Sequence, residues 1–329
     1  MSRCAMPRLD RRHLLALSAS AAVQPLLPMF VAGAGPLSYN LKPVAIVPGV
    51  WIIPGRPEVI TLENGGAIAN ITILDSPAGA IIVDTGPSRR FGDELAKVAR
   101  DLTGKDIARV YITHFHPDHM FGSQGFAAKS IAAPQGVIDG IKTAGNAFSD
   151  AMYYIARDWM RGTDVVVPET PVTTGTEDIG GRRLQLFALA GHTPSDLAIF
   201  DEKTGILITG DLVFLDRAPT TPHANLAVWR ETLGQLGQIP FSKLIPGHGP
   251  VEPGKRGIEQ TRSWLDGIEE TITRSFEKGL DMNEASKEPL PDSLSKLTLA
   301  RYEFERSVLH LYPKLEAARL PAVGKKSAG

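Results

Sequence analysis

The sequence predicts an α/β protein arranged as an αββα four-layer sandwich, in which helices cover the outer faces of two facing sheets, with further helices at the C-terminus. Two observations predict this fold. In both halves of the chain, β-prone apolar runs alternate with amphipathic helical patterns. Several of these runs also end in a Gly or Pro turn that carries a His or an Asp. In layered α/β folds, polar loops at strand ends gather at one edge and form functional sites.

The first half predicts a strand-rich region with one amphipathic helix. The helix covers residues 89–102, where Phe91, Leu95 and Val98 recur at spacings of three and four. A turn at residues 75–79 separates the two central strands. The expected strands cover residues 44–47, 50–53, 68–74, 80–83 and 110–113.

The second half repeats this alternation. A helix is expected near residues 225–237, and strands are expected near 184–190, 196–200, 205–209 and 243–245. Between the halves, residues 144–161 predict a helix with an apolar stripe, a pattern more typical of core or interface than of a substrate site. Tyr153 and Tyr154 in that helix are still candidates for donating to a substrate oxyanion.

The C-terminal region predicts two or three helices over residues 257–318 and disorder over residues 323–329. We therefore expect a main domain at residues 35–265 and a C-terminal helical extension with a disordered tail at residues 266–329. The length of 329 residues allows one large domain or two small ones.

Composition excludes some classes of function. The formal net charge is −1, which gives no electrostatic case for binding nucleic acid. Beyond residue 34 no run of roughly 18 apolar residues predicts a membrane span. The single cysteine, Cys4, lies in the N-terminal segment, so the rest of the chain cannot form a disulfide.

Residues 1–34 are expected to be an export signal. Arg11 and Arg12 precede a modestly apolar stretch, and Ala32-Gly33-Ala34 offers a cleavage site between small residues. The pattern resembles a twin-arginine signal, which implies a periplasmic protein that is free of the membrane after cleavage. The alternative is an unstructured tail with a chance pair of arginines.

The segment from Thr113 to His119 holds the densest group of potential metal-ligating residues in the chain. It holds His114, His116, Asp118 and His119 directly after a predicted strand. Imidazole and carboxylate are ligands that suit zinc and similar divalent metals. The two histidines at i and i+2 point to the same side of an extended segment, and the proline between them and Asp118 turns the chain. The loop can therefore offer ligands to two neighbouring metals, although a His-rich tract can also be a solvated loop.

Three further loops carry the same residue types. His192 follows the expected strand at 184–190, Asp211 follows the strand at 205–209, and His248 follows the strand at 243–245. The chain has eight histidines, and five of them lie at these strand ends. The other three are His13, His223 and His310.

The combination of His-x-His-x-Asp-His, Gly-His-Thr, a later Asp and Pro-Gly-His-Gly resembles the metallo-β-lactamase-fold superfamily over roughly residues 44–265. The resemblance includes the early Asp84-Thr85-Gly86 turn. It implies the metallo-β-lactamase fold for residues 35–265 and a centre of two zinc ions. By resemblance, the first metal would be held by His114, His116 and His192, the second by Asp118, His119 and His248, and both by a bridging Asp211.

Within the superfamily the chain is similar to the SoxH-like zinc hydrolases, through Thr113 to Gly122 and Gly210 to Phe214. That similarity implies a link to quinoprotein or sulfur-oxidation systems. It leaves the substrate open among small thioesters, lactones, amides and β-lactam-like compounds. The sequence leaves the oligomeric state open as well.

Several residues carry roles that the sequence leaves as alternatives. Asp118 would orient water or pass a proton, or serve only as a ligand, and Asp211 would be catalytic through its bridging position. Asp84 would hold the far N–H of a ligand histidine, or close its own turn. His223 and Asn70 are possible substrate contacts, but the sequence favours a loop or surface role for His223 and, for Asn70, a buried side chain that bonds to the backbone.

Two other functions compete with a zinc hydrolase. One is a persulfide-dioxygenase-like oxidoreductase, in which one iron is held by two histidines and one aspartate on the same scaffold. The other is a carrier without catalysis, which a full set of buried ligands disfavours because each would need another partner. Arg217 and Arg230 would bind an anionic substrate or form surface ion pairs.

Overall fold

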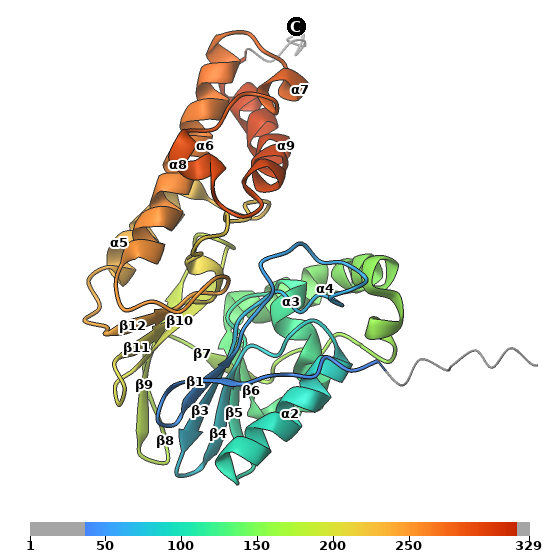
Figure 1. Cartoon of the computed structure of the whole chain (residues 1–329), viewed down its shortest axis with the longest axis vertical. Coiled ribbons are helices and arrows are strands. Elements are labelled where there is room, and N and C mark those ends of the chain that lie inside the picture. The colour runs from blue at the N-terminus through green and yellow to red at the C-terminus, as the bar shows by residue number, and fades with distance from the viewer. Residues whose placement is uncertain (1–36, 321–329) are drawn as a thin grey trace, which may run out of the picture. The chain divides into compact units, whose positions relative to one another are not determined.

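Two β-sheets face each other in the computed structural model, which describes residues 37–320. The predicted export signal with Cys4 and the predicted disordered tail at 323–329 lie outside the described residues. The seven-stranded sheet has the order β1-β2-β3-β4-β5-β6-β7 (Figure 1). Its strands are β1 (Val44–Val47), β2 (Val50–Ile53), β3 (Ile71–Ser76), β4 (Gly79–Val83), β5 (Ile107–Tyr111), β6 (Ile131–Pro134) and β7 (Thr170–Val172).

The second sheet has five strands in the order β12-β11-β10-β9-β8. Its strands are β8 (Gly175–Ile179), β9 (Arg182–Leu189), β10 (Asp196–Asp201), β11 (Ile206–Ile208) and β12 (Lys243–Ile245). The pairings are antiparallel except that β11 and β12 run parallel. In the first sheet, β1 to β4 pair antiparallel and β4 to β7 pair parallel.

Helices complete the sandwich and extend it. The α-helices are α2 (Arg89–Thr103), α3 (Pro117–Met120), α4 (Gln135–Ala156), α5 (Leu226–Leu236), α6 (Arg256–Glu277), α7 (Met282–Ala285), α8 (Asp292–Ser295) and α9 (Ala300–Arg319). Short 3₁₀ turns are η1 (Phe121–Gly125), η2 (Ala128–Ser130), η3 (Arg157–Met160) and η4 (Gly210–Leu212). None of the helices between residues 37 and 320 has the length and apolar character needed to cross a bilayer.

Alternating side chains along the central strands divide the core into layers. In β4, Ile81 and Val83 pack toward the second sheet, whereas Ile82 packs in the cluster under α2. In β10, Ile199 packs between the sheets and Phe200 packs under α5 and α6. Because successive strand residues point to opposite faces, each sheet is apolar on both sides. This arrangement confirms the predicted αββα sandwich with C-terminal helices.

Local signals fix the ends of helix α2. The Ser88 hydroxyl accepts a hydrogen bond from the Phe91 amide at 3.3 Å, which caps the helix start. Gly104 ends the helix in the left-handed conformation, with φ of 66°. Phe91 and Leu95 are buried against the first sheet. The observed bounds differ from the predicted 89–102 by one residue.

Other elements differ from expectation. Helix α4 begins at Gln135, nine residues before the predicted start at 144, and it ends at Ala156 because η3 follows. Strands β6, β7 and β8 were not predicted. The C-terminal region forms two long helices and two helices of one turn. The predicted domain boundary at residue 265 lies inside α6, and it stays a prediction.

Candidate metal centre

All seven predicted ligands lie on loops that follow strands, at one edge of the two sheets. The loop after β5 carries His114 and His116, and the loops after β9 and β12 carry His192 and His248. Asp211 lies in η4, directly after β11. Further along the loop after β5, Pro117 starts α3, whose single turn presents Asp118 and His119. The buried side chains of the set are His114, His116, Asp118, His119, His192, Asp211 and His248.

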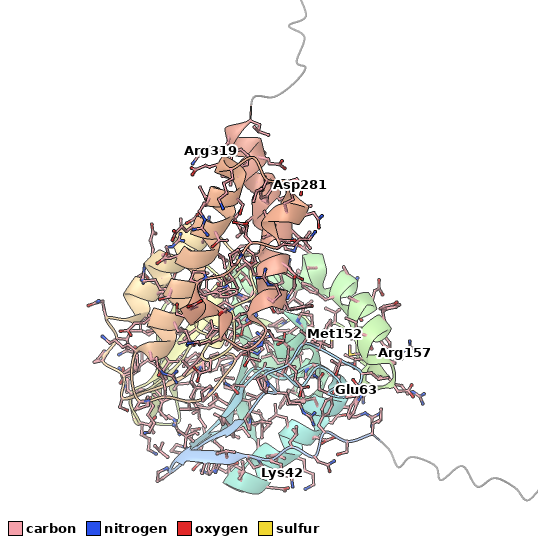
Figure 2. The ribbon with its side chains drawn as sticks, turned by 45° about the horizontal axis from the view of Figure 1, so that its top comes forward. Lys42, Glu63, Met152, Arg157, Asp281 and Arg319 are labelled. Atoms are coloured by element: carbon pink, nitrogen blue, oxygen red, sulfur yellow. The ribbon has the colours of Figure 1, made fainter. Side chains whose placement is uncertain are left out.

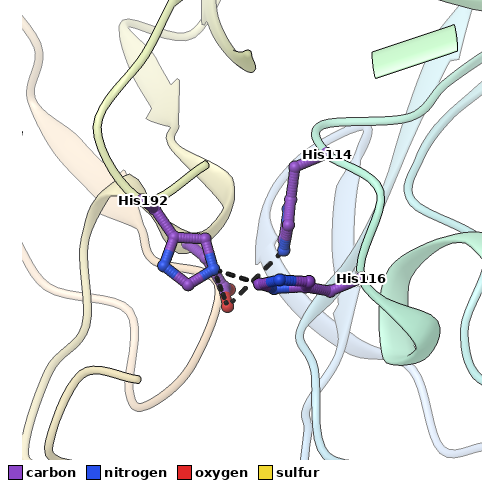
Figure 3. Close-up of side chains that lie close together, drawn as sticks. His114, His116 and His192 are labelled. Atoms are coloured by element: carbon purple, nitrogen blue, oxygen red, sulfur yellow. Dashed lines mark hydrogen bonds and ion pairs between the residues drawn. The ribbon is translucent and has the colours of Figure 1, made fainter. Parts of the chain in front are cut away.

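The first cluster draws ligands from both sheets. The ligand atoms of His114, His116, His192 and Asp211 lie within 4.8 Å of one another. His192 Nε2 is 3.0 Å from His116 Nδ1 and 3.3 Å from Asp211 Oδ2. Figure 3 shows His114 and His116 on one side of the centre, pointing toward His192 on the other. Three imidazoles and a carboxylate at this spacing form a possible site for one divalent metal.

The second cluster lies beside the first and consists of Asp118, His119 and His248. Asp118 Oδ2 is 3.6 Å from His119 Nε2 and 3.4 Å from His248 Nε2. Asp211 joins the two clusters, because its Oδ1 lies 3.1 Å from His119 Nε2 and 3.3 Å from His248 Nε2. The Oδ2 atom of the same carboxylate faces the first cluster. Asp211 therefore occupies the position of a bridging carboxylate.

Several potential metal-ligating atoms at the centre form no hydrogen bonds with one another, which favours a bound cation there. His114 Nε2, His119 Nε2 and Asp211 Oδ1 are buried and have no hydrogen-bond partner among the described residues. Buried polar atoms without partners are rare, because each costs the free energy of lost hydration. Two divalent metals would satisfy all of these atoms at once.

Asp84 fixes the orientation of two of the histidines. Its Oδ2 accepts hydrogen bonds from His119 Nδ1 at 2.7 Å and from the Thr113 hydroxyl at 2.8 Å. Since the Thr113 hydroxyl has one proton and gives it to Asp84, it accepts from His114 Nδ1 at 3.0 Å. Both imidazoles therefore carry their proton on Nδ1 and turn Nε2 toward the centre.

The remaining histidines are held differently. His248 Nδ1 donates to the Ile68 carbonyl at 2.9 Å. His116 Nε2 lies 2.8 Å from Nδ1 of His223, an exposed residue on the loop before α5. His192 Nδ1 has no hydrogen-bond partner among residues 37–320.

Close backbone approach sets the position of the bridging carboxylate. The Gly247 amide donates to the Gly210 carbonyl at 2.8 Å, which draws the loop after β12 against η4. A Cβ atom at Gly247 would lie 2.0 Å from Asp211 Oδ1. Only glycine leaves room for the carboxylate at this position.

Burial keeps the first-cluster imidazoles neutral. It lowers the pKa of His114 and of His116 well below the usual range, and it lowers the pKa of His192 to about 4. Neutral imidazole is the form that binds metals, so these three side chains are ready to act as ligands at neutral pH.

In the second cluster, neighbouring carboxylates raise the histidine pKa values, whereas burial lowers them in the first cluster. Burial alone would lower the pKa of His119, yet Asp211 and Asp84 outweigh it and hold that pKa well above its usual range. The same balance, led by Asp211, raises the pKa of His248. Burial raises the pKa of Asp118, but His119 and His248 outweigh it and lower the pKa to about 2. The carboxylates thus make the electrostatic potential at this cluster negative, which favours a cation there, either protons on the imidazole nitrogens or a divalent metal that displaces them.

A pocket of about 290 Å³ opens onto the centre. Its wall includes His116, Asp118, Asp211 and His248, together with His223. The structure therefore brings the predicted substrate contact His223 to the pocket as well as to His116.

Three other predicted substrate contacts are not part of this wall. Asn70 is buried, and its amide donates to the carbonyls of Pro246 at 2.9 Å and Gly249 at 2.8 Å. Tyr154 is 82% exposed. Tyr153 lies 3.4 Å from the Thr163 carbonyl through its hydroxyl. Met152 and Ile155 of the same helix line the pocket instead, and Figure 2 shows Met152 near the end of α4.

The rest of the pocket wall was not predicted from the sequence. Tyr302, Glu303 and Arg306 reach it from α9, which the sequence pattern indicates only as a C-terminal helix. Arg217 also lines the pocket, and it is 4% exposed. Its Nε and Nη1 atoms have no hydrogen-bond partner within the described range, 37–320. Its nearest carboxylate contact is Glu303 Oε1, 3.8 Å from Nη2.

Known proteins share both the sequence pattern and the fold. A linear primary-alkylsulfatase from Pseudomonas sp. (strain ATCC 19151) is 24% identical over 283 residues, which cover 72% of this chain and 53% of the alkylsulfatase. The chain thus spans about half the length of that relative.

Solved structures of similar fold include Pisa1, a stereoselective inverting sec-alkylsulfatase from Pseudomonas sp. It matches with a TM-score of 0.63 and 18% identity, over 86% of this chain and 52% of that one. A metallo-beta-lactamase from Pontibacter korlensis matches with a TM-score of 0.55 and 21% identity, over 69% of this chain and 99% of that one. At these identities the structural likeness establishes the fold alone.

The family itself is established by the sequence. Residues 64–248, which run from the loop before β3 to the last ligand histidine, match the model of the metallo-beta-lactamase superfamily. This match covers more than half of the 329 residues and all seven clustered side chains. The chain therefore belongs to the metallo-beta-lactamase superfamily.

Proposed function

We propose that the protein is an exported, dinuclear zinc hydrolase that acts on a small anionic ester or related acyl compound. The observation that carries the proposal is the position of Asp211, which directs Oδ2 to one cluster of histidines and Oδ1 to the other. A carboxylate placed in this way, among buried nitrogens that lack partners, would be suited to hold two metals at once.

The clustered residues would have different roles in such a site. His114, His116 and His192 would hold the first zinc, Asp118, His119 and His248 the second, and Asp211 both. Bound zinc lowers the pKa of a coordinated water to about 7 and polarises the bond under attack. Because Asp118 also lines the pocket, it is placed to orient that water and to carry a proton toward the leaving group.

The environment of Arg217 supports the proposal that the substrate is an anion. Its guanidinium is buried in the pocket wall, and two of its nitrogens lack partners within residues 37–320. A buried cation with free donors is costly unless a ligand satisfies it, and a guanidinium binds carboxylate or sulfate through paired hydrogen bonds. The likeness to an alkylsulfatase makes a sulfate ester the second candidate substrate, beside thioesters, lactones, amides and β-lactams.

The proposed setting follows from the sequence alone. The twin-arginine-type segment supports export to the periplasm, and the SoxH-like features support a link to quinoprotein or sulfur-oxidation systems. Both remain predictions.

Elemental analysis of the mature protein, purified without added metal, tests the proposal first. We expect about two zinc ions per chain, the number of clusters in the site. His116→Ala should lower bound metal and hydrolysis together, whereas His310→Ala on the exposed face of α9 should change neither. One iron per chain with oxygen uptake on a persulfide would replace the hydrolase with an oxidoreductase. Full metal and full activity in His116→Ala would overturn the ligand assignment.

Sulfate esters and carboxylic or thioesters of matched chain length separate the two substrate candidates. Release of sulfate without hydrolysis of the acyl esters would favour the sulfatase, and the reverse result would favour the acyl hydrolase.

A further inference from the structure

We infer that His223 is a positioning residue of the metal centre, and that helix α9 holds it in place from the far end of the chain. The inference rests on the proposed metal-dependent function, and it gives His223 a role apart from substrate contact. Its starting point is the 2.8 Å contact between His223 Nδ1 and His116 Nε2.

That contact sets the protonation of His116. The other ring nitrogen, Nδ1, faces the first cluster at 3.0 Å from His192 Nε2. A nitrogen that binds a metal cannot also carry a proton, so the proton of neutral His116 belongs on Nε2 and is donated to His223. The acceptor on His223 therefore selects the tautomer and the ring orientation that turn Nδ1 toward the metal.

His116 differs in this respect from the neighbouring ligands. His119 and His114 depend on the buried carboxylate of Asp84, directly or through Thr113. His248 depends on a main-chain carbonyl. The partner of His116 is instead an exposed side chain on a loop, so its position depends on how that loop is held.

Helix α9 supplies the contacts that hold this loop, residues 217–223. The Thr221 hydroxyl lies 2.7 Å from the Ser307 hydroxyl, and both residues are fully buried. Arg306 Nη1 donates to the Thr220 hydroxyl at 2.9 Å. These contacts fall on the two residues next to Pro222-His223, so α9 fixes the backbone from which the histidine projects.

A second set of contacts anchors the start of the loop. The Ala218 amide donates to the carbonyl of Thr298, just before α9, at 2.9 Å. Arg217 faces Glu303 of α9, which also accepts from Arg306 at 3.0 Å. The C-terminal helix is thus connected to the metal centre by a continuous path from Ser307 through Thr221 and His223 to His116.

Metal affinity tests the first part of the inference. We would load the full mature chain with zinc(II) and measure its affinity by competition with a coloured chelator. His223→Ala should lower the affinity for one of the two zinc ions by about 10- to 100-fold, the usual effect of losing the hydrogen-bond partner of a ligand histidine. His223→Asn should restore most of the affinity, because Asn Oδ1 can accept a hydrogen bond where His Nδ1 does.

The matched control is His310→Ala, which removes another exposed histidine near enough to His223 to act on it electrostatically, and it should leave the affinity for both zinc ions unchanged. The melting temperature of the metal-free protein should be the same in all three variants, since His223 is exposed. Unchanged zinc affinity in His223→Ala would overturn the inference, as would an equal loss in His223→Ala and His223→Asn.

Ser307→Ala tests the part played by α9. It removes the hydroxyl that contacts Thr221. The affinity for the same zinc ion should fall, but by less than it falls in His223→Ala. Ser275→Ala is the control, because Ser275 is also buried in a helix but its hydroxyl donates only to the Thr271 carbonyl of α6. Loss of affinity in His223→Ala with none in Ser307→Ala would overturn the role of α9.

The wild-type measurement separates this inference from the proposed function. A wild-type chain that binds no zinc would overturn both. Two zinc ions in the wild type with unchanged affinity in His223→Ala would overturn the positioning role and leave the proposed function standing.

Discussion

The carboxylate of Asp84 lies 2.7 Å from Nδ1 of His119 and forms a second hydrogen bond, at 2.8 Å, with the hydroxyl of Thr113. Through Thr113 it also orients His114. One carboxylate therefore directs a histidine of each cluster toward the centre. Its backbone has a φ of 66°, a left-handed conformation that asparagine and aspartate adopt more readily than most residues.

Asp84→Asn should lower zinc affinity by about 10- to 100-fold. The amide keeps the shape and tolerates the backbone conformation, but its NH₂ group must face a donor, whichever way it turns. Chelator competition measures the change. Asp106→Asn is the control, because the side chain of Asp106 is 97% exposed. Equal zinc affinity in Asp84→Asn and the wild type would contradict the orienting role.

Arg217→Met should raise KM for anionic esters by about 10- to 100-fold, the range expected for charge-assisted hydrogen bonds worth about 1.5–3 kcal/mol. A neutral ester of the same size should be far less affected. Steady-state kinetics on the two substrates measure the difference. Arg230→Met is the control, since Arg230 pairs with Asp266 and Glu269 on the surface. If both esters lose equally, Arg217 has no role in charge recognition.

Asp196 should make the metal-free protein less stable as pH rises. Burial raises its pKa to about 8, against hydrogen bonds from Thr193 that lower it. A protonated Asp196 also resolves the contacts of the Thr193 hydroxyl, whose single proton faces both the Ser195 carbonyl at 2.7 Å and Asp196 Oδ1 at 2.9 Å.

The folded-state pKa of Asp196 exceeds the unfolded value, so between about pH 4 and pH 8 unfolding releases a proton and stability falls with rising pH. The slope from this one group is at most about 1.4 kcal/mol per pH unit, and it ends above pH 8. Urea unfolding with excess chelator at several pH values should show a flatter profile in Asp196→Asn. Asp150→Asn, on the exposed face of α4, should keep the wild-type slope. A wild-type slope in Asp196→Asn would show that another group titrates.

Replacing Arg11 and Arg12 together by lysine should leave the precursor in the cytoplasm, because twin-arginine recognition depends on both guanidinium groups. Fractionation of cells that produce wild-type and variant chains, followed by immunoblotting, measures the distribution. Lysine keeps the positive charge, so a general effect of charge on export is controlled. Unchanged export of the double variant would contradict the twin-arginine prediction.

Residues with strong local signals allowed much of the fold to be predicted. Helix α2 has its apolar stripe, its serine cap and its terminal glycine within the sequence that forms it. Strand β8 was missed because Gly175-Thr176-Glu177-Asp178-Ile179 has little β propensity, and it forms by pairing with β9. Strand β5 ends at Tyr111 and not at Thr113, because the Thr113 amide donates to Asp84 in place of a neighbouring strand.

Some residues of the candidate site could likewise be predicted from the sequence, and others could not. His114 and His116 lie in one short motif, and His192, Asp211 and His248 each follow a strand, so their meeting could be predicted from the edge that the strands share. Glu303 and Arg306 could not be placed at the pocket, because nothing in a C-terminal helix indicates which earlier loop it will contact. Their contribution depends on tertiary packing of α9 against the 217–223 loop.

The centre lies on the seam between the two sheets, where the Leu197 amide donates to the Thr113 carbonyl at 2.8 Å. Residues 114–119 come from one sheet and residues 192, 211 and 248 from the other. A bound pair of ions would tie together segments that lie between 73 (119 to 192) and 134 (114 to 248) positions apart, much as a covalent cross-link does. Neither sheet alone offers a complete ligand set, so binding of metal by all of these side chains would require the two sheets to be docked. A chain that is threaded through a membrane unfolded would lose its metals on the way.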